Sequence, residues 1–361
     1  MTFITLIIVI SVLVFVHELG HFIVAKKFGV RVDEFSIGFP PRIWSWKRGE
    51  TTYSINLIPF GGYVKIFGEN PDEASMSGPD SARSFVNKNR GVQALILIAG
   101  VAMNIIFAWG LLSASFMLGA ERAAQSASSA TAVLVAEVLP DSPAEKAGLK
   151  QNDLIVSITD VTGALRGKIS TSDLENIVSS SKGSALVFTY ERGGKTATTS
   201  ITALTGVVKD KIAIGVAMVD VENLRLSFFP AMIEGAKTTG KLIVLTSVGL
   251  WDFLVNIFSF RADLSQVSGP VGIAGYLNDA RQFGLSALFA FIALISINLA
   301  VINLLPFPAL DGGRLLFVGI ESIIRRPINP KFANALNLLG FALLLLLMVV
   351  ITFSDIGKLV K

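Results

Sequence analysis

The stretch VLVFVHELGHFIVAKKFG, residues 12–29, contains the only two histidines of the chain, His17 and His21. Both lie in an apolar run, about residues 3–25, that is long enough for one helix to cross a ~30 Å bilayer core. Ionisable side chains are costly at that depth, so a cluster of them indicates a functional site. The run lacks the basic start and small-residue cleavage site of a secretory leader, and we interpret it as a membrane span.

The spacing of the two histidines predicts a metal site. Four residues turn a helix by ~400°, which places both imidazoles on one face. Two ring nitrogens at this spacing can bind one zinc ion, and Glu18 between them can act as general base towards water that the metal activates. A chance match is the alternative. It is disfavoured because the only two histidines of the chain fall at the required spacing with a glutamate between them.

A catalytic zinc usually has three protein ligands, and two histidines leave one to find. The chain has no cysteine, so the third ligand must be a carboxylate. Asp311 stands out in INLAVINLLPFPALDGGRLLF, residues 297–317, because Pro306 and Pro308 break the preceding span. Broken backbone at membrane depth is tolerated where it is buried in protein or lines a cavity. The alternative, that Asp311 only caps the next helix, is less favoured beside a two-ligand zinc site.

The composition supports a membrane protein. The 361 residues are 52% hydrophobic and 16% charged, with a mean hydropathy of +0.63, whereas soluble domains average about 25% charged residues. The absence of cysteine excludes disulfides and thiolate metal sites. A net charge of +4 without a basic, aromatic-rich stripe gives no indication of nucleic acid binding. We predict a polytopic α-helical membrane protein.

Four transmembrane helices are expected, at residues 3–25, 91–118, 285–305 and 332–353. Residues 221–284 are ambiguous, since Lys241 and Asp252 bracket only ten residues of an apolar segment. We favour an amphipathic helix at the membrane interface there, and a further span, at 242–258, remains the alternative.

The segments between the spans suggest the domain organisation. Residues 1–120 form an N-terminal membrane half, with a membrane-associated β-hairpin region at 31–90 that turns near residues 48–50. Residues 121–132 are a linker of small and polar residues. Residues 133–220 have the ordinary charge density and the strand-like alternation of apolar and polar residues expected of an inserted α+β domain. Residues 285–361 form the C-terminal membrane half.

Basic residues orient the spans. They are concentrated at 26–65 and 314–331, and the positive-inside rule therefore makes both segments cytoplasmic. The N-terminus and residues 133–220 then face outside. Because Lys26 and Lys27 follow His21 closely, the metal site is expected near the cytoplasmic side.

HELGH in the first span, together with NLLPFPALDGG in a later one, resembles the site-2 protease family of intramembrane zinc metalloproteases. The similarity is greatest to bacterial members that cleave anti-sigma factors and signal-peptide remnants. IPFGGYVKIFGE (58–69), AGVAMNIIFA (99–108) and SGPVGI (268–273) extend the resemblance over nearly the whole chain. Two motifs depart from the family pattern: GFPP at 38–41 replaces Gly-Phe-Gly-Pro, and AGV at 99–101 replaces Ala-Gly-Pro. For these two motifs the resemblance does not predict the shape of the loop, but neither contains a ligand residue.

The resemblance implies roles for individual residues. It implies that one zinc ion is bound by His17, His21 and Asp311, that Glu18 is catalytic, and that Asn303 contacts the substrate backbone. An amide offers both a donor and an acceptor to an extended peptide. For Asn303 an alternative is a bond to a carbonyl freed by the prolines.

VLVAEVLPDSPAEKAGLKQNDLIVSITD, residues 133–160, resembles a PDZ domain of the bacterial protease type, another small β domain being the alternative. In this segment we expect a helix that starts at residues 142–144 and ends near 147–149, with a strand after Asp153. A PDZ domain would bind peptides by strand addition. It could receive a newly cut C-terminus or exclude bulky ectodomains, and both roles stay open.

Peptide hydrolysis requires an extended substrate, and the β segment at 58–67 could pair with one. Gly61, Gly62 and Tyr63 are therefore candidate substrate-binding residues. The expected function is zinc-dependent cleavage of transmembrane segments of single-pass proteins in the bacterial inner membrane, after a prior ectodomain cut. The alternatives are a non-catalytic PDZ scaffold with a structural metal site, and an ion or metal transporter, which the absence of inverted repeats disfavours.

Overall fold

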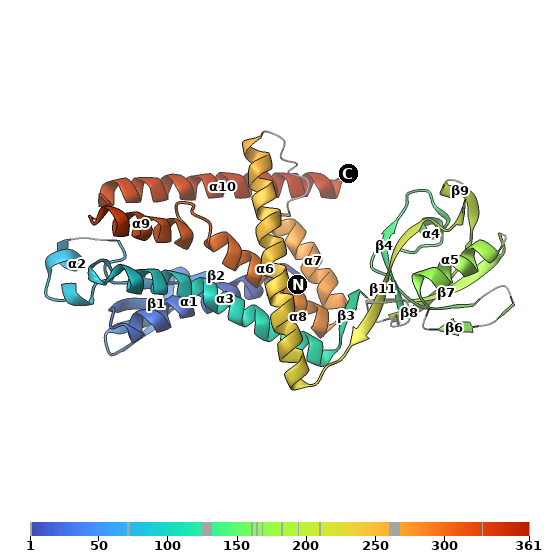
Figure 1. The fold of residues 1–361 in the computed structure, drawn as a ribbon, viewed down its shortest axis with the longest axis horizontal. Helices are drawn as coiled ribbons and strands as arrows, with labels where there is room; N and C mark the ends of the chain where they lie inside the picture. Colours follow the sequence, from blue (N-terminus) through green and yellow to red (C-terminus); the bar gives the residue numbers. More distant parts are fainter. Residues whose placement is uncertain are drawn as a thin grey trace. The chain divides into compact units, whose positions relative to one another are not determined.

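The structure is a computed structural model that describes residues 2–70, 73–123, 132–159, 162–163, 165–167, 169–181, 183–193, 195–208, 211–259, 268–326 and 328–360. Most of the expected linker at 121–132 lies outside these residues. The chain forms two compact units (Figure 1). Unit 1 comprises Met1–Ser113, Met232–Asn278 and Ala290–Lys361, and unit 2 comprises Ala114–Ala231 and Asp279–Phe289.

Unit 1 is built largely from long apolar helices. Its elements are α1 (Thr2–Lys27), β1 (Val32–Arg48), β2 (Thr51–Ile66), α2 (Glu73–Ser77), the 3₁₀ turns η1 (Ser81–Arg83) and η2 (Phe85–Asn87), α9 (Asp311–Ile324) and α10 (Pro330–Val360). Most of four further helices also belongs to it: α3 (Arg90–Leu118), α6 (Phe228–Phe258), α7 (Pro270–Gln282) and α8 (Leu285–Asn303). Helix ends have local causes: Gly29, at φ 65°, follows α1 as a left-handed cap, and the Asn89 side chain accepts a hydrogen bond from Val92 N, 2.8 Å away, at the start of α3.

Five helices of the described chain are long and apolar enough to cross a membrane. They are Thr2–Lys27, Arg90–Leu118, Phe228–Ile257, Leu285–Asn303 and Pro330–Gly357. Four of them contain or closely match the expected spans. The other lies in α6, in the segment for which an interfacial helix was favoured, so length and composition leave both placements of α6 open. The long apolar helices are those of a membrane protein.

β1 and β2 pair antiparallel around a turn at Gly49, as the sequence predicted. Both strands bend, so that residues 34–37 pair with 52–55 along one edge and with 62–65 along the other. The last part of β2, residues 62–66, is therefore an edge strand: its second edge has no strand partner among the described residues. Such an edge can accept a further strand.

A shared apolar core joins α1, the hairpin, α3 and α9. Its buried members include Ala25, Val32, Val64, Ile96 and Val318. Gly20 permits the closest approach, because a Cβ there would lie 2.3 Å from the backbone oxygen of Ala99 on α3. Small residues let membrane helices pack backbone to backbone in this way.

Unit 2 is a sheet with two helices and its own core. The strand order is β3-β11-β4-β5-β7-β8, with β6 paired to β5 and a separate pair β9-β10. The elements are β3 (Ala120–Ala123), β4 (Ala132–Val138), α4 (Pro143–Lys146), β5 (Leu154–Thr159), β6 (Leu165–Gly167), α5 (Thr171–Ser180), β7 (Ala185–Arg192), β8 (Lys195–Thr202), β9 (Leu204–Val208), β10 (Lys211–Ala213) and β11 (Val216–Leu224).

The local elements expected after residue 133 form as predicted. Ser142 caps α4, β5 follows Asp153 directly, and Val133, Ile155, Phe188 and others make a buried core. The fully buried Asp153 carboxylate is held by Arg192, whose Nε lies 2.5 Å from Oδ1. A buried carboxylate requires such a partner.

Candidate metal centre and catalytic cavity

Three side chains from α1 and α9 meet in the interior of unit 1. Nε2 of His17 lies 2.9 Å from Oδ2 of Asp311 and 3.1 Å from Nε2 of His21. Nε2 of His21 lies 3.2 Å from the same carboxylate oxygen. Both histidines are buried and Asp311 is partly buried. The structure thus brings together the residues that the sequence predicted as ligands.

The triangle of donor atoms fits zinc. Ligand atoms about 2.0–2.1 Å from a tetrahedral zinc ion are separated from one another by about 3.3 Å, close to the 2.9–3.2 Å found here. Two imidazole nitrogens and one carboxylate oxygen are also a donor set that zinc prefers. Three protein ligands leave the fourth position open, as in catalytic rather than structural sites.

α3 supports both imidazoles from behind. Nδ1 of His21 lies 2.8 Å from the backbone oxygen of Ile96, and Nδ1 of His17 lies 3.3 Å from Nδ2 of Asn104. Between these contacts is Gly100, where a Cβ would lie 2.3 Å from Nε2 of His21. The three α3 residues are spaced by four, so they share one face of that helix.

Asp311 reaches the histidines because the chain turns sharply between α8 and α9. Leu310 occupies the N-cap position and Asp311 is the first residue of α9. Its carboxylate meets the histidines, so the reading of Asp311 as only a helix cap is not favoured. Gly312 and Gly313 allow the tight turn: a Cβ at either position would lie 2.2 Å from a backbone oxygen of residue 305 or 307.

Glu18 lines a cavity beside the His17–His21–Asp311 group. The cavity measures about 220 Å³ and is lined by Glu18, His21, Tyr63, Val64, Ile66, Glu69, Asp311 and Arg314. Oε2 of Glu18 accepts a hydrogen bond from Val64 N at 3.2 Å. Arg314 forms an ion pair with Glu69 at the cavity wall. A carboxylate, the ligand triangle and an edge strand therefore border one polar space.

The predicted substrate-binding residues lie around this site. Nδ2 of Asn303, at the end of α8, is 3.5 Å from Nε2 of His17. Gly61 packs on α1, where a Cβ would meet Val14 at 3.0 Å, and Gly62 pairs with β1. Tyr63 lines the cavity itself. Proximity to the site is clear for Asn303 and Tyr63, and Gly61 and Gly62 shape the strand beside it.

Sequence reasoning missed the supporting residues. Asn104 was not singled out, although an asparagine inside an apolar helix is a signal in itself. Gly100 was noted only as part of the AGV motif at 99–101. Arg314 and Glu69 lie far apart in the chain, and no local pattern connects them.

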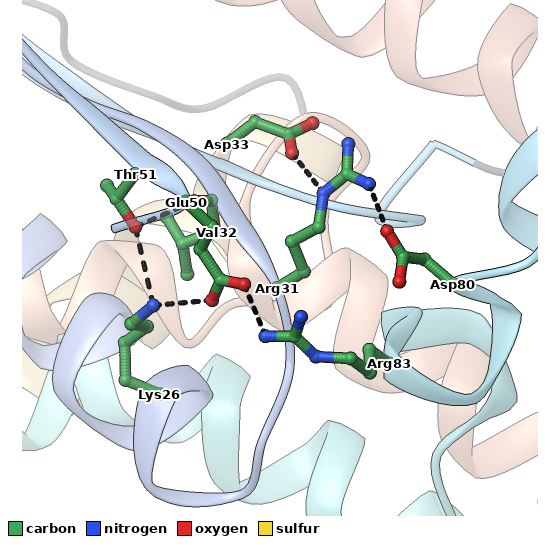
Figure 2. A network of polar contacts seen from close by, with 8 residues as sticks. All are labelled: Lys26, Arg31, Val32, Asp33, Glu50, Thr51, Asp80 and Arg83. Carbon is green, nitrogen blue, oxygen red and sulfur yellow. Dashed lines mark hydrogen bonds and ion pairs between the residues drawn. The ribbon is translucent and has the colours of Figure 1, made fainter. Parts of the chain in front are cut away.

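A charged network joins the C-terminal end of α1 to the hairpin (Figure 2). Lys26 Nζ donates to Glu50 Oε1 at 2.6 Å, and Arg83 donates to the other Glu50 oxygen at 2.5 Å. Nearby, Arg31 binds both Asp33 and Asp80. The hydrogen bonds from Lys26 and then Arg83 hold the pKa of Glu50 below its usual value. The Glu50 contacts join the end of α1 to the turn between β1 and β2 and to η1.

The chain has long apolar helices of the kind that cross membranes. It also has a largely buried His-His-Asp group that could hold a metal ion and would leave its fourth coordination position open. These features are those of a membrane metalloprotein. The sequence profile of peptidase family M50 matches residues 5–347. The zinc metalloprotease RasP of Oceanobacillus iheyensis is 31% identical over 440 aligned residues, covering 99% of both chains. The zinc metalloprotease RasP of Shouchella clausii is 29% identical over 433, also covering 99% of both.

The chain therefore belongs to peptidase family M50, the site-2 protease family. It is a zinc metallopeptidase, and the resemblance noted in the sequence is confirmed. Its substrates are peptides.

Proposed function

We propose that this protein is an intramembrane endopeptidase that cuts transmembrane segments of single-pass membrane proteins, such as anti-sigma factors or signal-peptide remnants, after a prior ectodomain cut. The observation that carries the proposal is the position of the His17–His21–Asp311 triangle and Glu18. Three of these residues lie on α1, a helix of 26 mainly apolar residues, beside a polar cavity. Polar chemistry inside a membrane-spanning helix is suited to a substrate that is itself embedded.

In this proposal His17, His21 and Asp311 hold the zinc ion. Bound zinc supplies Lewis acidity that lowers the pKa of a water molecule and polarises the scissile carbonyl. Glu18 accepts the proton that the attacking water loses and returns it to the leaving amide nitrogen, as the carbon–nitrogen bond breaks. The hydrogen bond from Val64 N orients the Glu18 carboxylate for both transfers.

The edge strand at residues 62–66 is the proposed substrate clamp. A substrate strand laid along its open edge would be held extended next to Glu18 and the ligand triangle. Asn303, at the end of α8, would contact the substrate backbone, and Tyr63 would line the cavity that receives the substrate. An extended backbone exposes the carbonyls that a helix hides.

Unit 2 is proposed to be a PDZ domain over residues 133–220 that faces outside. A cavity of about 560 Å³ supports this, because it lies between α5 and the strands β10 and β11 and has apolar walls that include Leu174, Val178, Ile214 and Met218. Such a groove could take a peptide end or serve as a size filter. The N-terminal half of the membrane portion, residues 1–120, and the C-terminal half, 285–361, would together form the protease.

We propose four spans, with α6 in the segment 221–284 lying at the interface. Thr2, at the start of α1, hydrogen-bonds Asn278 shortly before α8, whereas His17 lies near Asn303 at the end of α8. α1 and α8 thus run in the same direction. A complete crossing by α6 would reverse α8, so this direction favours an interfacial α6, and in Figure 1 α6 runs across α1, α3 and α10. The bacterial inner membrane, with the site near its cytoplasmic face, is the proposed location.

A reconstitution assay tests the proposal. The full-length protein in liposomes is given a single-pass substrate either with its ectodomain or trimmed to a short stub, and the product ends are determined by mass spectrometry. We expect cleavage inside the transmembrane segment and only of the trimmed form. Cuts confined to exposed loops, or no preference between the two forms, would contradict it. Zinc bound without any cleavage of either form would favour the non-catalytic scaffold.

A further inference from the structure

The two imidazoles of the metal centre differ in how their outer nitrogens are bound. Both rings direct Nε2 towards Asp311 and Nδ1 towards α3. A nitrogen that ligates a metal must offer a lone pair, so the proton of each neutral ring must be on Nδ1. That proton in turn needs an acceptor, because both histidines are buried.

For His21 the acceptor is unambiguous. Its Nδ1 lies 2.8 Å from the backbone oxygen of Ile96, and a carbonyl oxygen can only accept. The Ile96 carbonyl therefore keeps the proton on Nδ1 and the lone pair on Nε2.

For His17 the partner is the side-chain amide of Asn104, which has both a donor and an acceptor. Nδ2 of Asn104 lies 3.3 Å from Nδ1, an arrangement that would require Nδ1 to accept and would put the ring proton on Nε2, against the metal. The Oδ1 atom of the same amide is buried without a partner. The whole residue is fully buried, so no solvent satisfies that oxygen.

A half-turn of the amide about its Cβ–Cγ bond exchanges two atoms of nearly equal size. Oδ1 then accepts from Nδ1 of His17, and the Nε2 lone pair points to the metal. We propose that Asn104 is a positioning residue for the metal centre, whose Oδ1 accepts a hydrogen bond from His17 Nδ1 and thereby keeps Nε2 available to zinc.

Gly100 and the helix packing make this contact geometrically possible. Ile96, Gly100 and Asn104 follow one another at intervals of four on α3, and all three face the two histidines. The position of Asn104 is fixed from the other side, since Ser296 Oγ donates to its backbone oxygen at 2.9 Å. The amide can therefore turn without its backbone moving.

Asn104→Asp separates the acceptor role from the donor role, because a carboxylate accepts but has no N–H. The full-length protein with ¹⁵N-labelled histidine is titrated with Zn²⁺ against a chelator, and the ring ¹⁵N shifts are recorded. With only two histidines in the chain, every signal comes from His17 or His21. We expect Asn104→Asp to keep wild-type or tighter zinc affinity with Nδ1 of both rings protonated.

Asn104→Leu removes the acceptor and should weaken zinc binding ~10–100-fold, the usual effect of losing a partner of a metal-ligating histidine. Asn298→Leu is the matched control: this α8 asparagine bonds Thr246, away from the site, and its loss should leave affinity unchanged. If Asn104→Asp binds zinc as weakly as Asn104→Leu, the acceptor role is wrong; if Asn104→Leu does not fold, Asn104→Asp still decides.

The inference rests on the proposed ligand set, and the same spectra separate the two. If zinc does not change the Nε2 signals of the wild-type protein, the ligand set itself is wrong. If it changes them, and Asn104→Asp alone loses affinity or shifts the His17 proton to Nε2, only the role of Asn104 fails.

Discussion

Nε2 of His17 and Oδ2 of Asp311 lie 2.9 Å apart although the two residues are 294 positions apart in the chain. One comes from the first helix and the other from the first residue of α9. The intervening chain includes all of unit 2, so the metal centre depends on the packing of unit 1 and not on sequence proximity. Substitution of either residue should therefore weaken zinc binding more than it destabilises the rest of the fold.

Asp311→Ala should remove one of three ligands and lower zinc affinity by more than about 100-fold. Metal content of the purified protein after dialysis against a chelator measures this. Asp252→Ala, at an exposed position of α6, should retain zinc. Equal metal content in the two variants would exclude Asp311 as a ligand.

Gly100→Ala should disrupt the site by steric contact alone. The new Cβ would lie 2.3 Å from Nε2 of His21 and 2.8 Å from Cε1 of His17, so the rings must move. We expect zinc affinity to fall by at least about tenfold. Gly110→Ala, on the same helix with no atom within 4 Å of the added Cβ, is the control and should bind zinc normally. A Gly100→Ala protein with normal zinc affinity would show that α3 is not packed closely against the two histidines.

Val64→Pro tests the edge strand. Proline removes the N–H that binds Glu18 and interrupts the edge to which substrate is proposed to pair. The cleavage rate should fall at least about tenfold, ~1.4 kcal/mol in transition-state free energy, while zinc stays bound. Val64→Ala keeps the N–H and should cleave within about threefold of wild type. Unchanged cleavage by the proline variant would rule out this strand as the clamp.

Glu50→Gln tests the charged network through its pH dependence. Because Lys26 and Arg83 lower the pKa of Glu50, the contact stabilises the protein above the usual carboxyl pKa of about 4.3 and is lost as the pH falls through the lowered value. Glu50 is partly exposed, so the contribution should be at most about 1 kcal/mol. The unfolding midpoint in detergent should be lower for Glu50→Gln at pH 7 and equal to wild type near pH 3. A difference that persists at pH 3 would point to packing instead.

Much of this architecture could be predicted because its causes are local. The i, i+4 spacing of His17 and His21 defines one helix face whatever surrounds it, and apolar runs of sufficient length become long helices. The helix cap at Ser142 and the hairpin turn at Gly49 depend on residues within one turn. The absence of cysteine and of any further histidine predicted that a third ligand would be a carboxylate, and the structure places Asp311 beside both histidines.

The remaining features depend on contacts between distant segments. Asn104 could have been noticed as a polar residue in an apolar helix, but its partner, His17, is set by the packing of α3 on α1 through Gly20. The ion pair of Arg314 with Glu69 has no sequence signal at all. For α6, composition fits both a span and an interfacial helix, and only the relative direction of α1 and α8 bears on the choice.

The central claim, zinc-dependent peptide hydrolysis by Glu18, is tested most directly by comparing wild type with Glu18→Gln in liposomes that contain a trimmed single-pass substrate. Zinc content and cleavage are measured on the same preparations. We predict that Glu18→Gln keeps its zinc and loses cleavage by ~10²–10⁴-fold, the usual share of a general base. Equal cleavage by the two proteins, with zinc bound in both, would contradict the account.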